Sequence, residues 1–271
     1  LIRRQRQMCI RDRLVKTAVP ISSIHSPCPT VCSSNGMPVS SLRLSSTRET
    51  ERREAINYTE RTIDLASRVG AKAVIIHMGE VPVNVESEEK LHRLYEEGLA
   101  NSETYIKVKE ELVSERKSKA SSHLAPAMES LEELSEYGKN QGIMLGLENR
   151  VSSYEVPNIN EMDKLLSMIG SDSVGYWHDV GHAEVQERLG FTPHKEWLLR
   201  FNHRVIGVHL HDVIGISDHQ VPGQGSVNWD MVSEYLPHNT IRTCEVNQWN
   251  DEETVRGAVP FLQENGIIDR E

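Results

Sequence analysis

The sequence predicts an α/β fold of the TIM-type (β/α)8 barrel, on three observations. The chain has 271 residues, which is long for an ordinary domain but typical of a single α/β barrel of about 250 residues. Short runs rich in β-branched residues alternate with longer amphipathic stretches, which is the pattern of βα units around a parallel sheet. Residues that can bind a metal recur at the ends of these runs, about one βα unit apart.

Six runs are predicted to be strands: residues 19–25, 71–77, 142–148, 174–179, 205–212 and 241–246. A closed barrel of this type needs eight strands, and the shortage lies at the N-terminal end. We therefore expect the first two βα units to be lacking. An open sheet edge would follow, and with it a tendency to form a homo-oligomer.

The helices are predicted from apolar residues at spacings of three and four. Residues 48–69 carry this pattern and then reach Gly70, which is typical of a helix C-cap. The segment from about 80 to 122 is charged, weakly periodic and much longer than an ordinary βα loop. We interpret it as a helical insertion, either a lid over the barrel mouth or a solvated helix surface.

Residues 1–13 are treated separately from the single domain expected at 14–271. They hold five arginines and one aspartate without periodicity, and we interpret them as a non-native or disordered leader. The whole chain has a formal net charge of −10, and removal of this leader leaves 25 basic against 39 acidic residues, or −14. So acidic a surface disfavours nucleic acid as a partner.

The apolar runs are strand-sized, far below the roughly 20 residues of a membrane-spanning helix, so no membrane association is expected. The four cysteines are Cys9, Cys28, Cys32 and Cys244, and none of them forms a C-x-x-C pair. Free thiols in a reducing compartment are the simplest interpretation. We expect a cytoplasmic protein.

Each predicted strand ends at or near a residue that can bind a metal: His25, His77, Glu148, Asp179, His209 and Glu245. The last four are separated by 31, 30 and 36 residues, about one βα unit each, and the carboxyl ends of barrel strands open on one face. Two glutamates, an aspartate and an imidazole suit Mn²⁺, Mg²⁺, Co²⁺ or Zn²⁺. Any one of these acids alone is more often a helix cap or ion-pair partner than a metal ligand, so it is the recurrence that favours a metal site.

Further histidines lie close to these strand ends. Asp179 and His182 are three residues apart at a strand-to-helix junction, so both can face the site. His209 and His211 share one face of a strand because side chains alternate. A surface interpretation is given to the five histidines away from the strand ends, which are His92, His123, His194, His203 and His238.

Six motifs follow one another along the chain: Ile76-His77-Met78-Gly79, Leu147-Glu148-Asn149-Arg150, His178-Asp179-Val180-Gly181-His182, His209-Leu210-His211-Asp212, Asp218-His219 through Pro222-Gly223-Gln224-Gly225, and Cys244-Glu245. From about residue 19 to 261 this succession resembles the xylose-isomerase-like TIM-barrel superfamily. That group includes sugar-phosphate isomerases and epimerases, ketose 3-epimerases, inosose dehydratases and endonuclease IV. The motifs are specific for fold and metal site but not for substrate.

The resemblance implies that one shared divalent metal is held by Glu148, Asp179, His209 and Glu245. In the endonuclease branch two more metals are bound, by ligands that correspond to His25, His77, His182 and His219, with an Asp-x-His pair in the last loop. Here Asp218 is adjacent to His219, and this departure of one residue puts a complete third site in question. One ion per chain is expected, with up to three as the alternative.

These observations predict a metal-dependent isomerase or epimerase that acts on a small sugar or sugar phosphate. The metal would stabilise an enediolate, while Glu148 and Glu245 transfer a proton on opposite faces of the substrate. His25, His77 and His182 would contact substrate. Arg150 would balance a substrate carboxylate or phosphate, or else form an internal salt bridge.

Two other functions stay open. The first is a zinc-dependent endonuclease at abasic sites, similar to endonuclease IV, which would need three metals and a basic groove. The second is a non-catalytic sugar-binding barrel. The sequence does not choose among isomerase, epimerase and dehydratase, nor does it name the sugar.

Overall fold

The computed structural model describes residues 20–33 and 36–270. The chain divides into two compact units. Among the described residues, unit 1 comprises 20–33, 36–80, Ser121–Glu148 and Asn160–Gly175, and unit 2 comprises Val81–Ala120, Asn149–Ile159 and 176–270. The leader predicted at residues 1–13 lies outside the described part of the chain.

Unit 1 contains three parallel strands in the order β1-β2-β4. These are β1 (Ser23–His25), β2 (Ala73–Ile76) and β4 (Met144–Glu148). All four residues of β2 are buried, as expected for a central parallel strand. The unit also holds the 3-10 turn η1 (Val39–Ser41), β3 (Gly79–Glu80) and most of α5 (Ile159–Met168).

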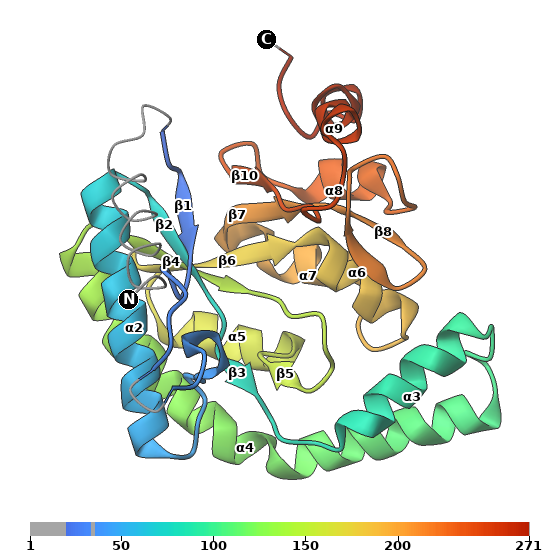
Figure 1. The fold of residues 1–271 in the computed structure, drawn as a ribbon, viewed down its shortest axis with the longest axis horizontal. Coiled ribbons are helices and arrows are strands. Elements are labelled where there is room, and N and C mark those ends of the chain that lie inside the picture. The colour runs from blue at the N-terminus through green and yellow to red at the C-terminus, as the bar shows by residue number, and fades with distance from the viewer. Residues whose placement is uncertain (1–19, 34–35, 271) are drawn as a thin grey trace. The chain divides into compact units, whose positions relative to one another are not determined.

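Helix α2 (Glu49–Val69) packs against β1 and β2 (Figure 1). It turns Ile56, Ile63 and Ala66 into the core of unit 1, where each is at most 2% exposed. Gly70 ends the helix in the left-handed conformation at φ 75°, which glycine adopts without a steric cost. The helix and the C-cap predicted from the apolar spacing are both confirmed.

Unit 2 contains a second set of parallel strands in the order β6-β7-β10. They are β6 (Val174–Asp179, which belongs to unit 2 from Tyr176 onward), β7 (Val205–Leu210) and β10 (Ile241–Cys244). The other elements are β5 (Glu155–Val156), α6 (Val180–Arg188), α7 (His194–Phe201), η2 (Asn202–Arg204), the antiparallel pair β8 (Asp212–Ile214) and β9 (Ser217–Gln220), α8 (Trp229–Tyr235) and α9 (Glu252–Glu264). Across both units, each of the six predicted runs contains one of these parallel strands.

The Pro222-Gly223-Gln224-Gly225 turn is held by one buried carboxylate. Asp212 is 1% exposed and accepts hydrogen bonds from the backbone N–H groups of Gly223 (2.9 Å) and Val227 (3.0 Å) and from Trp229 Nε1 (3.2 Å). A Cβ at Gly225 would lie 2.4 Å from Asp212 Oδ1. The glycine therefore lets the loop close around this carboxylate.

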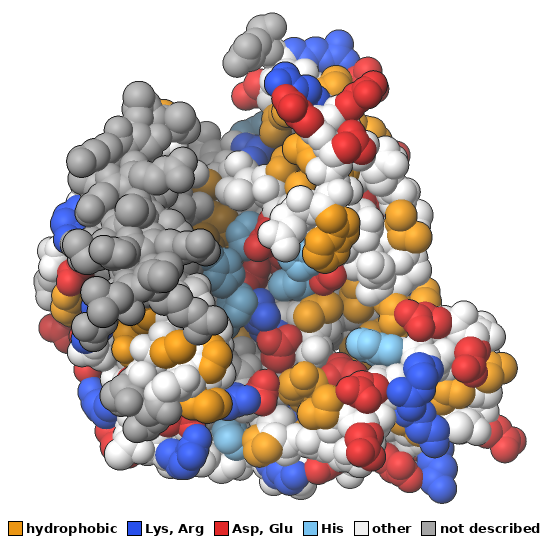
Figure 2. Space-filling model, in the orientation of Figure 1, with side chains coloured by type: hydrophobic (Ala, Val, Ile, Leu, Met, Phe, Trp, Pro, Cys, Tyr) orange, Lys and Arg blue, Asp and Glu red, His pale blue; other side chains and the backbone are white. Residues whose placement is uncertain are grey.

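The predicted insertion is helical and consists of α3 (Val85–Glu96) and α4 (Glu103–Asn140). Residues 103–120 of α4 belong to unit 2 and residues 121–140 to unit 1. In unit 2, Leu91 of α3 and Tyr105 of α4 pack with Phe191, and Tyr105 Oη donates to Leu189 O at 3.0 Å. The outer surface of α3 and the first half of α4 carries charged side chains of both signs (Figure 2). The role as a lid stays a prediction.

One acid of α3 is buried in unit 2. Glu88 is 3% exposed, and it accepts a hydrogen bond from Ser153 N at 3.0 Å. Burial raises the pKa of Glu88 to about 7, and the nearby charge of Glu155 adds to the effect. Glu88 is therefore protonated in the folded chain at acidic pH and must ionise inside the protein as the pH rises.

Replacing Glu88 with glutamine is expected to stabilise the protein at pH 8 but not at pH 4. The folded pKa of about 7 exceeds the ordinary value of 4.5, so the wild type loses stability as the pH rises between these values. The shift corresponds to on the order of 3 kcal/mol. Thermal unfolding of both proteins at pH 4, 6 and 8 measures the effect. The same difference in melting temperature between the two proteins at all three pH values would contradict the burial of this carboxyl group.

Cys28, Cys32 and Cys244 are free thiols, whereas Cys9 lies outside the described residues. Burial raises the pKa of the Cys28 thiol, which makes it a weaker nucleophile at neutral pH. Among the helices of the described chain, none is long and apolar enough to cross a membrane.

Candidate metal centres

The structure places all six predicted strand-end residues at or next to the carboxyl ends of parallel strands. His25, Glu148 and Asp179 are the last residues of β1, β4 and β6. His77 and Glu245 directly follow β2 and β10, and His209 is the penultimate residue of β7. His25, His77 and Glu148 belong to unit 1, and the other three belong to unit 2.

In unit 1, the side chains of His25, His77 and Glu148 form one cluster. Their potential ligand atoms all lie within 4.8 Å of one another. His77 Nε2 contacts Glu148 Oε2 directly, and His25 Nε2 lies 3.6 Å from the same oxygen. Glu148 is 1% exposed, whereas the two histidines are about one-third exposed (36% and 34%). The cluster is therefore open to a small ligand on the histidine side.

The His25 ring is oriented by the main chain. His25 Nδ1 lies 3.0 Å from Ser26 O, and because a carbonyl only accepts, this nitrogen carries the proton. Nε2 of the neutral ring then keeps its lone pair toward Glu148. A hydrogen bond from the second ring nitrogen to a carbonyl is the usual support of a metal-binding histidine.

In unit 2, His209 lies between two carboxylates. His209 Nδ1 is 2.8 Å from Glu245 Oε2 and 3.4 Å from Asp179 Oδ2. Asp179 is fully buried and His209 is 4% exposed, while the Glu245 side chain is 37% exposed. All three groups are ordinary ligands of divalent metals.

Asp179 is held in place by several donors. Its Oδ1 accepts a hydrogen bond from His182 N at 2.7 Å, which caps the N-terminus of α6. His211 Nε2 lies 2.9 Å from the same oxygen. Burial alone would raise the pKa of Asp179, but the neighbouring His182 and His211 outweigh it and hold this pKa well below its usual range. The carboxylate is therefore ionised.

The role of His211 was not predicted from the sequence. The backbone N–H of His219 donates to His211 Nδ1 at 2.8 Å, so the ring proton lies on Nε2 and is donated to Asp179. A Cβ on Gly181 would lie 2.1 Å from the His211 ring. The glycine of the His178-Asp179-Val180-Gly181-His182 motif thus leaves space for this ring.

The second cluster of unit 2 consists of His182, Asp218 and His219. Their ligand atoms lie within 4.8 Å of one another. His219 Nδ1 is 3.0 Å from Asp218 Oδ1, and His182 Nε2 is 3.8 Å from Asp218 Oδ2. His182 Nδ1 lies 3.0 Å from Asn149 O, so its proton is on Nδ1 and the Nε2 lone pair faces the cluster.

The backbone explains why the adjacent residues Asp218 and His219 can face the same point. In a regular strand, neighbouring side chains lie on opposite faces. His219 has φ 56°, which is unusual for a residue with a side chain. This left-handed residue breaks the alternation, so the adjacent spacing does not keep the two side chains apart. A third metal site at this cluster stays a prediction.

Arg150 forms the internal salt bridge that was the alternative to a substrate contact. Its Nε lies 2.9 Å from Glu155 Oε1, and the two side chains are 12% and 17% exposed. A substrate contact by Arg150 stays a prediction.

The surface interpretation of His194 is wrong. His194 is fully buried, with Nδ1 3.0 Å from Glu184 Oε2 and Nε2 3.1 Å from His178 Nε2. The hydrogen bonds continue from His178 Nδ1 to Tyr176 Oη at 2.8 Å. Burial and the nearby His194 hold the pKa of His178 well below its ordinary value. Of the other histidines given a surface interpretation, His203 and His238 are exposed, and His92 and His123 are half-buried.

The loop that follows Glu245 carries an exposed aromatic residue. Trp249 is 75% exposed. The loop is tied to β9 by a hydrogen bond from Asn247 N to His219 O at 2.9 Å. A second hydrogen bond, from Asn250 N to Asn247 O at 3.2 Å, closes a turn within the loop. Sequence reasoning passed over this tryptophan because it belongs to no motif.

Comparison with known proteins gives a family match over nearly the whole chain. The model of a family described as xylose isomerase-like TIM barrel matches residues 8–265. The uncharacterized protein y4fM of Sinorhizobium fredii is 24% identical over 195 residues, which are 71% of this chain and 52% of that protein. The chain therefore spans about half the length of this curated relative.

Solved structures give the same fold. A crystal structure of D-psicose 3-epimerase in the presence of D-fructose matches with a TM-score of 0.63 at 13% identity, covering 97% of this chain and 84% of that one. A Thermus thermophilus protein soaked with ZnCl₂ matches with a TM-score of 0.61 at 19% identity and the same two coverages. With a family match that includes every strand described above, the chain belongs to the xylose isomerase-like TIM-barrel family, as the motifs predicted.

Proposed function

We propose that the protein is a divalent-metal-dependent isomerase or epimerase of a small sugar, acting by proton transfer. The observation that carries the proposal is the pair of ligand clusters at strand carboxyl ends, His25–His77–Glu148 in unit 1 and Asp179–His209–Glu245 in unit 2. Active sites of TIM-type barrels lie at this end of the strands. Sugar epimerases among the proteins of similar fold support the same reaction class.

Glu148, Asp179, His209 and Glu245 are the proposed ligands of the principal metal. Their oxygen and imidazole donors fit Mn²⁺, Mg²⁺, Co²⁺ or Zn²⁺. When bound, such an ion would supply Lewis-acid stabilisation of negative charge on the substrate oxygens. Asp179 is suited to binding the metal without transferring a proton, because its carboxylate is already oriented by hydrogen bonds from His182 N and His211.

Glu245 and Glu148 are the proposed proton carriers. A base removes the proton from the carbon beside the carbonyl, and an acid returns one to the opposite face when the product is the epimer. Glu245 is 37% exposed and Glu148 is 1% exposed, so Glu245 is the more accessible of the two carboxylates. Where they do not bind further metal ions, His25 and His182 would accept hydrogen bonds from substrate hydroxyls at Nε2. His77 would also contact substrate.

The experiment combines metal analysis with solvent exchange. The purified protein is loaded with Mn²⁺, Mg²⁺, Co²⁺ or Zn²⁺, and its metal content per chain is measured. Ketoses are then incubated with it in D₂O. The proposal expects deuterium at the carbon beside the carbonyl. Isomerisation without deuterium would indicate a hydride shift instead, and a protein that binds neither metal nor sugar would contradict the proposal.

A second candidate is a zinc-dependent phosphodiester hydrolase similar to endonuclease IV. The observation in its favour is the His182–Asp218–His219 cluster, which offers ligands for a further ion. The formal net charge of −10 opposes binding of a nucleic acid backbone. About three zinc ions per chain, together with cleavage of a duplex at an abasic site, would favour this candidate. The non-catalytic sugar-binding barrel remains the third, and it requires sugar binding without metal.

A further inference from the structure

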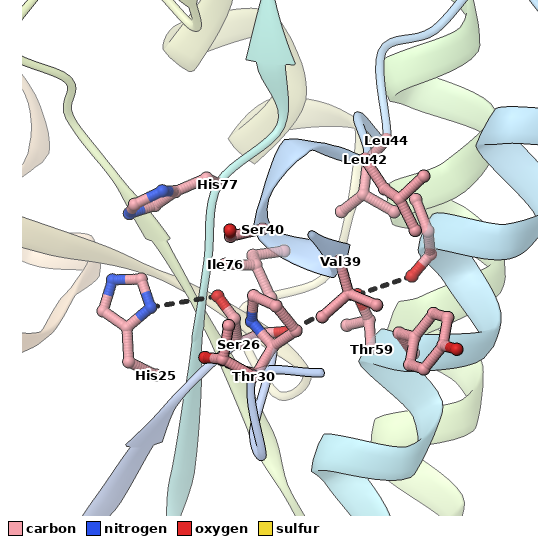
Figure 3. Close-up of a pocket in the computed structure, with 13 residues that line it drawn as sticks. His25, Ser26, Thr30, Val39, Ser40, Leu42, Leu44, Thr59, Ile76 and His77 are labelled. Carbon is pink, nitrogen blue, oxygen red and sulfur yellow. Dashed lines mark hydrogen bonds between the residues drawn. The ribbon is translucent and has the colours of Figure 1, made fainter. Parts of the chain in front are cut away.

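Unit 1 contains a cavity of about 340 Å³ beside two of the candidate metal ligands. His25 and His77 line one end, and Val39, Leu42 and Leu44 line the other (Figure 3). This volume is at the lower end of the range of about 300–1,000 Å³ usual for small-molecule sites. A molecule whose reacting end lies at the two histidines would extend into this space.

Hydroxyl groups lie between the two ends of the cavity. Ser26, Thr30, Ser40 and Thr59 all line it (Figure 3). Ser26 Oγ donates to Thr59 Oγ1 at 3.4 Å, and Thr59 Oγ1 donates to Ala55 O at 3.0 Å. Each hydroxyl also has acceptor capacity. The mixture of hydroxyl and aliphatic groups matches the C–OH and C–H groups of a sugar.

No lysine, arginine, aspartate or glutamate is among the described residues that line the cavity. The nearby cations Arg43 and Arg48 line a separate cavity of about 700 Å³. Both are paired there with Glu51, at 3.6 Å from Arg43 Nη1 and 3.1 Å from Arg48 Nε. Phosphate is recognised by cations, above all arginine, so an anionic group would be poorly compensated in the smaller cavity.

We infer that this cavity, the polyol pocket lined by His25, Ser26, Ser40, Leu44, Thr59 and His77, binds the uncharged hydroxylated end of the substrate. The substrate is then an unphosphorylated monosaccharide rather than a sugar phosphate. The inference rests on the proposed function where it concerns the reaction of the sugar. The binding of a sugar in this pocket does not depend on that reaction. It narrows the substrate class that the metal ligands alone leave open.

The first test compares D-fructose with fructose 6-phosphate. Binding to the metal-loaded protein is measured by calorimetry, and deuterium exchange is measured separately. D-fructose is expected to bind, and its kcat/KM for exchange is expected to be at least roughly tenfold higher than that of fructose 6-phosphate. A difference of this size is typical of one uncompensated charge. Preference for the phosphate ester would overturn the pocket assignment and leave the proposed function intact. Binding of an abasic-site duplex with no binding of either sugar would overturn both.

The second test places a cation in the polyol pocket. Ser40 is exposed, so the variant Ser40→Arg should fold, and it is expected to raise the KM for D-fructose about tenfold with little change in kcat. The matched control is Ser41→Arg, because Ser41 lines the larger cavity and not the polyol pocket. Equal effects of the two substitutions on sugar binding would overturn the inference. A third outcome is that D-fructose binds, that only Ser40→Arg weakens this binding, and that not even the wild type catalyses exchange. The pocket assignment would then be supported and the proposed reaction contradicted.

Discussion

Glutamine in place of Glu148 or Glu245 is expected to slow deuterium exchange into a ketose by roughly 10²- to 10⁴-fold, the usual contribution of a general acid or base. The amide keeps one oxygen for metal or hydrogen bonding but cannot accept the proton from carbon. Exchange is followed by NMR, and metal content and circular dichroism are measured on the same samples. Loss of exchange with metal and fold retained would support the proton-carrying role.

The matched control for these two variants is Glu136→Gln on the exposed surface of α4. It removes the same charge from the chain, so its exchange rate should equal that of the wild type. Unchanged exchange in both Glu148→Gln and Glu245→Gln would rule out proton transfer by this pair. If only Glu245→Gln loses exchange, Glu148 is a metal ligand without a proton-carrying role.

Alanine in place of Gly181 is expected to lower metal affinity by about 10- to 100-fold, which is typical for loss of a group that supports a ligand. The added Cβ would lie 2.1 Å from His211 Cε1 and 2.3 Å from Nδ1, so the buried ring must move. Asp179 would then lose the donor at 2.9 Å. The overpacking should also cost about 1–3 kcal/mol of stability. Calorimetric metal titration and denaturant unfolding measure the two effects.

Gly257→Ala provides the control, because Gly257 lies within α9 and its added Cβ would meet nothing within 4 Å beyond its chain neighbours and the backbone of its own helix. It should leave metal affinity unchanged. The double variant Gly181→Ala with His211→Ala separates strain from ligand support. With the ring removed, Gly181→Ala should cost little further stability, and an undiminished cost in this background would contradict the proposed contact.

The strands and strand-end ligands could be predicted because their signals are local. A run of β-branched residues identifies a buried strand, and a polar residue at its carboxyl end is conspicuous in that run. This applies to Glu148 after four apolar or glycine positions and to Asp179 at the end of β6. Each position is set by a few neighbouring residues, so one sequence is sufficient.

The clusters depended on backbone and tertiary detail that spacing does not carry. The adjacent Asp218 and His219 depart by one residue from the Asp-x-His spacing of the resembling family, which put a complete third site in question. The left-handed backbone of His219 at φ 56° nevertheless brings the two side chains together. His194 looks like the polar start of a surface helix, yet Glu184 and His178 satisfy both its nitrogens in the interior. These partners lie 10 and 16 residues away, so a local pattern does not reveal them.

The exposure of Trp249 gives the protein an optical property of its own. The chain has four tryptophans; Trp177 and Trp197 are fully buried, Trp229 is 6% exposed, and Trp249 is 75% exposed. Aqueous quenchers therefore have one accessible indole to act on, and it lies four residues beyond a proposed metal ligand. The quenchable fraction of the intrinsic fluorescence thus reports on the loop after Glu245 without any attached label.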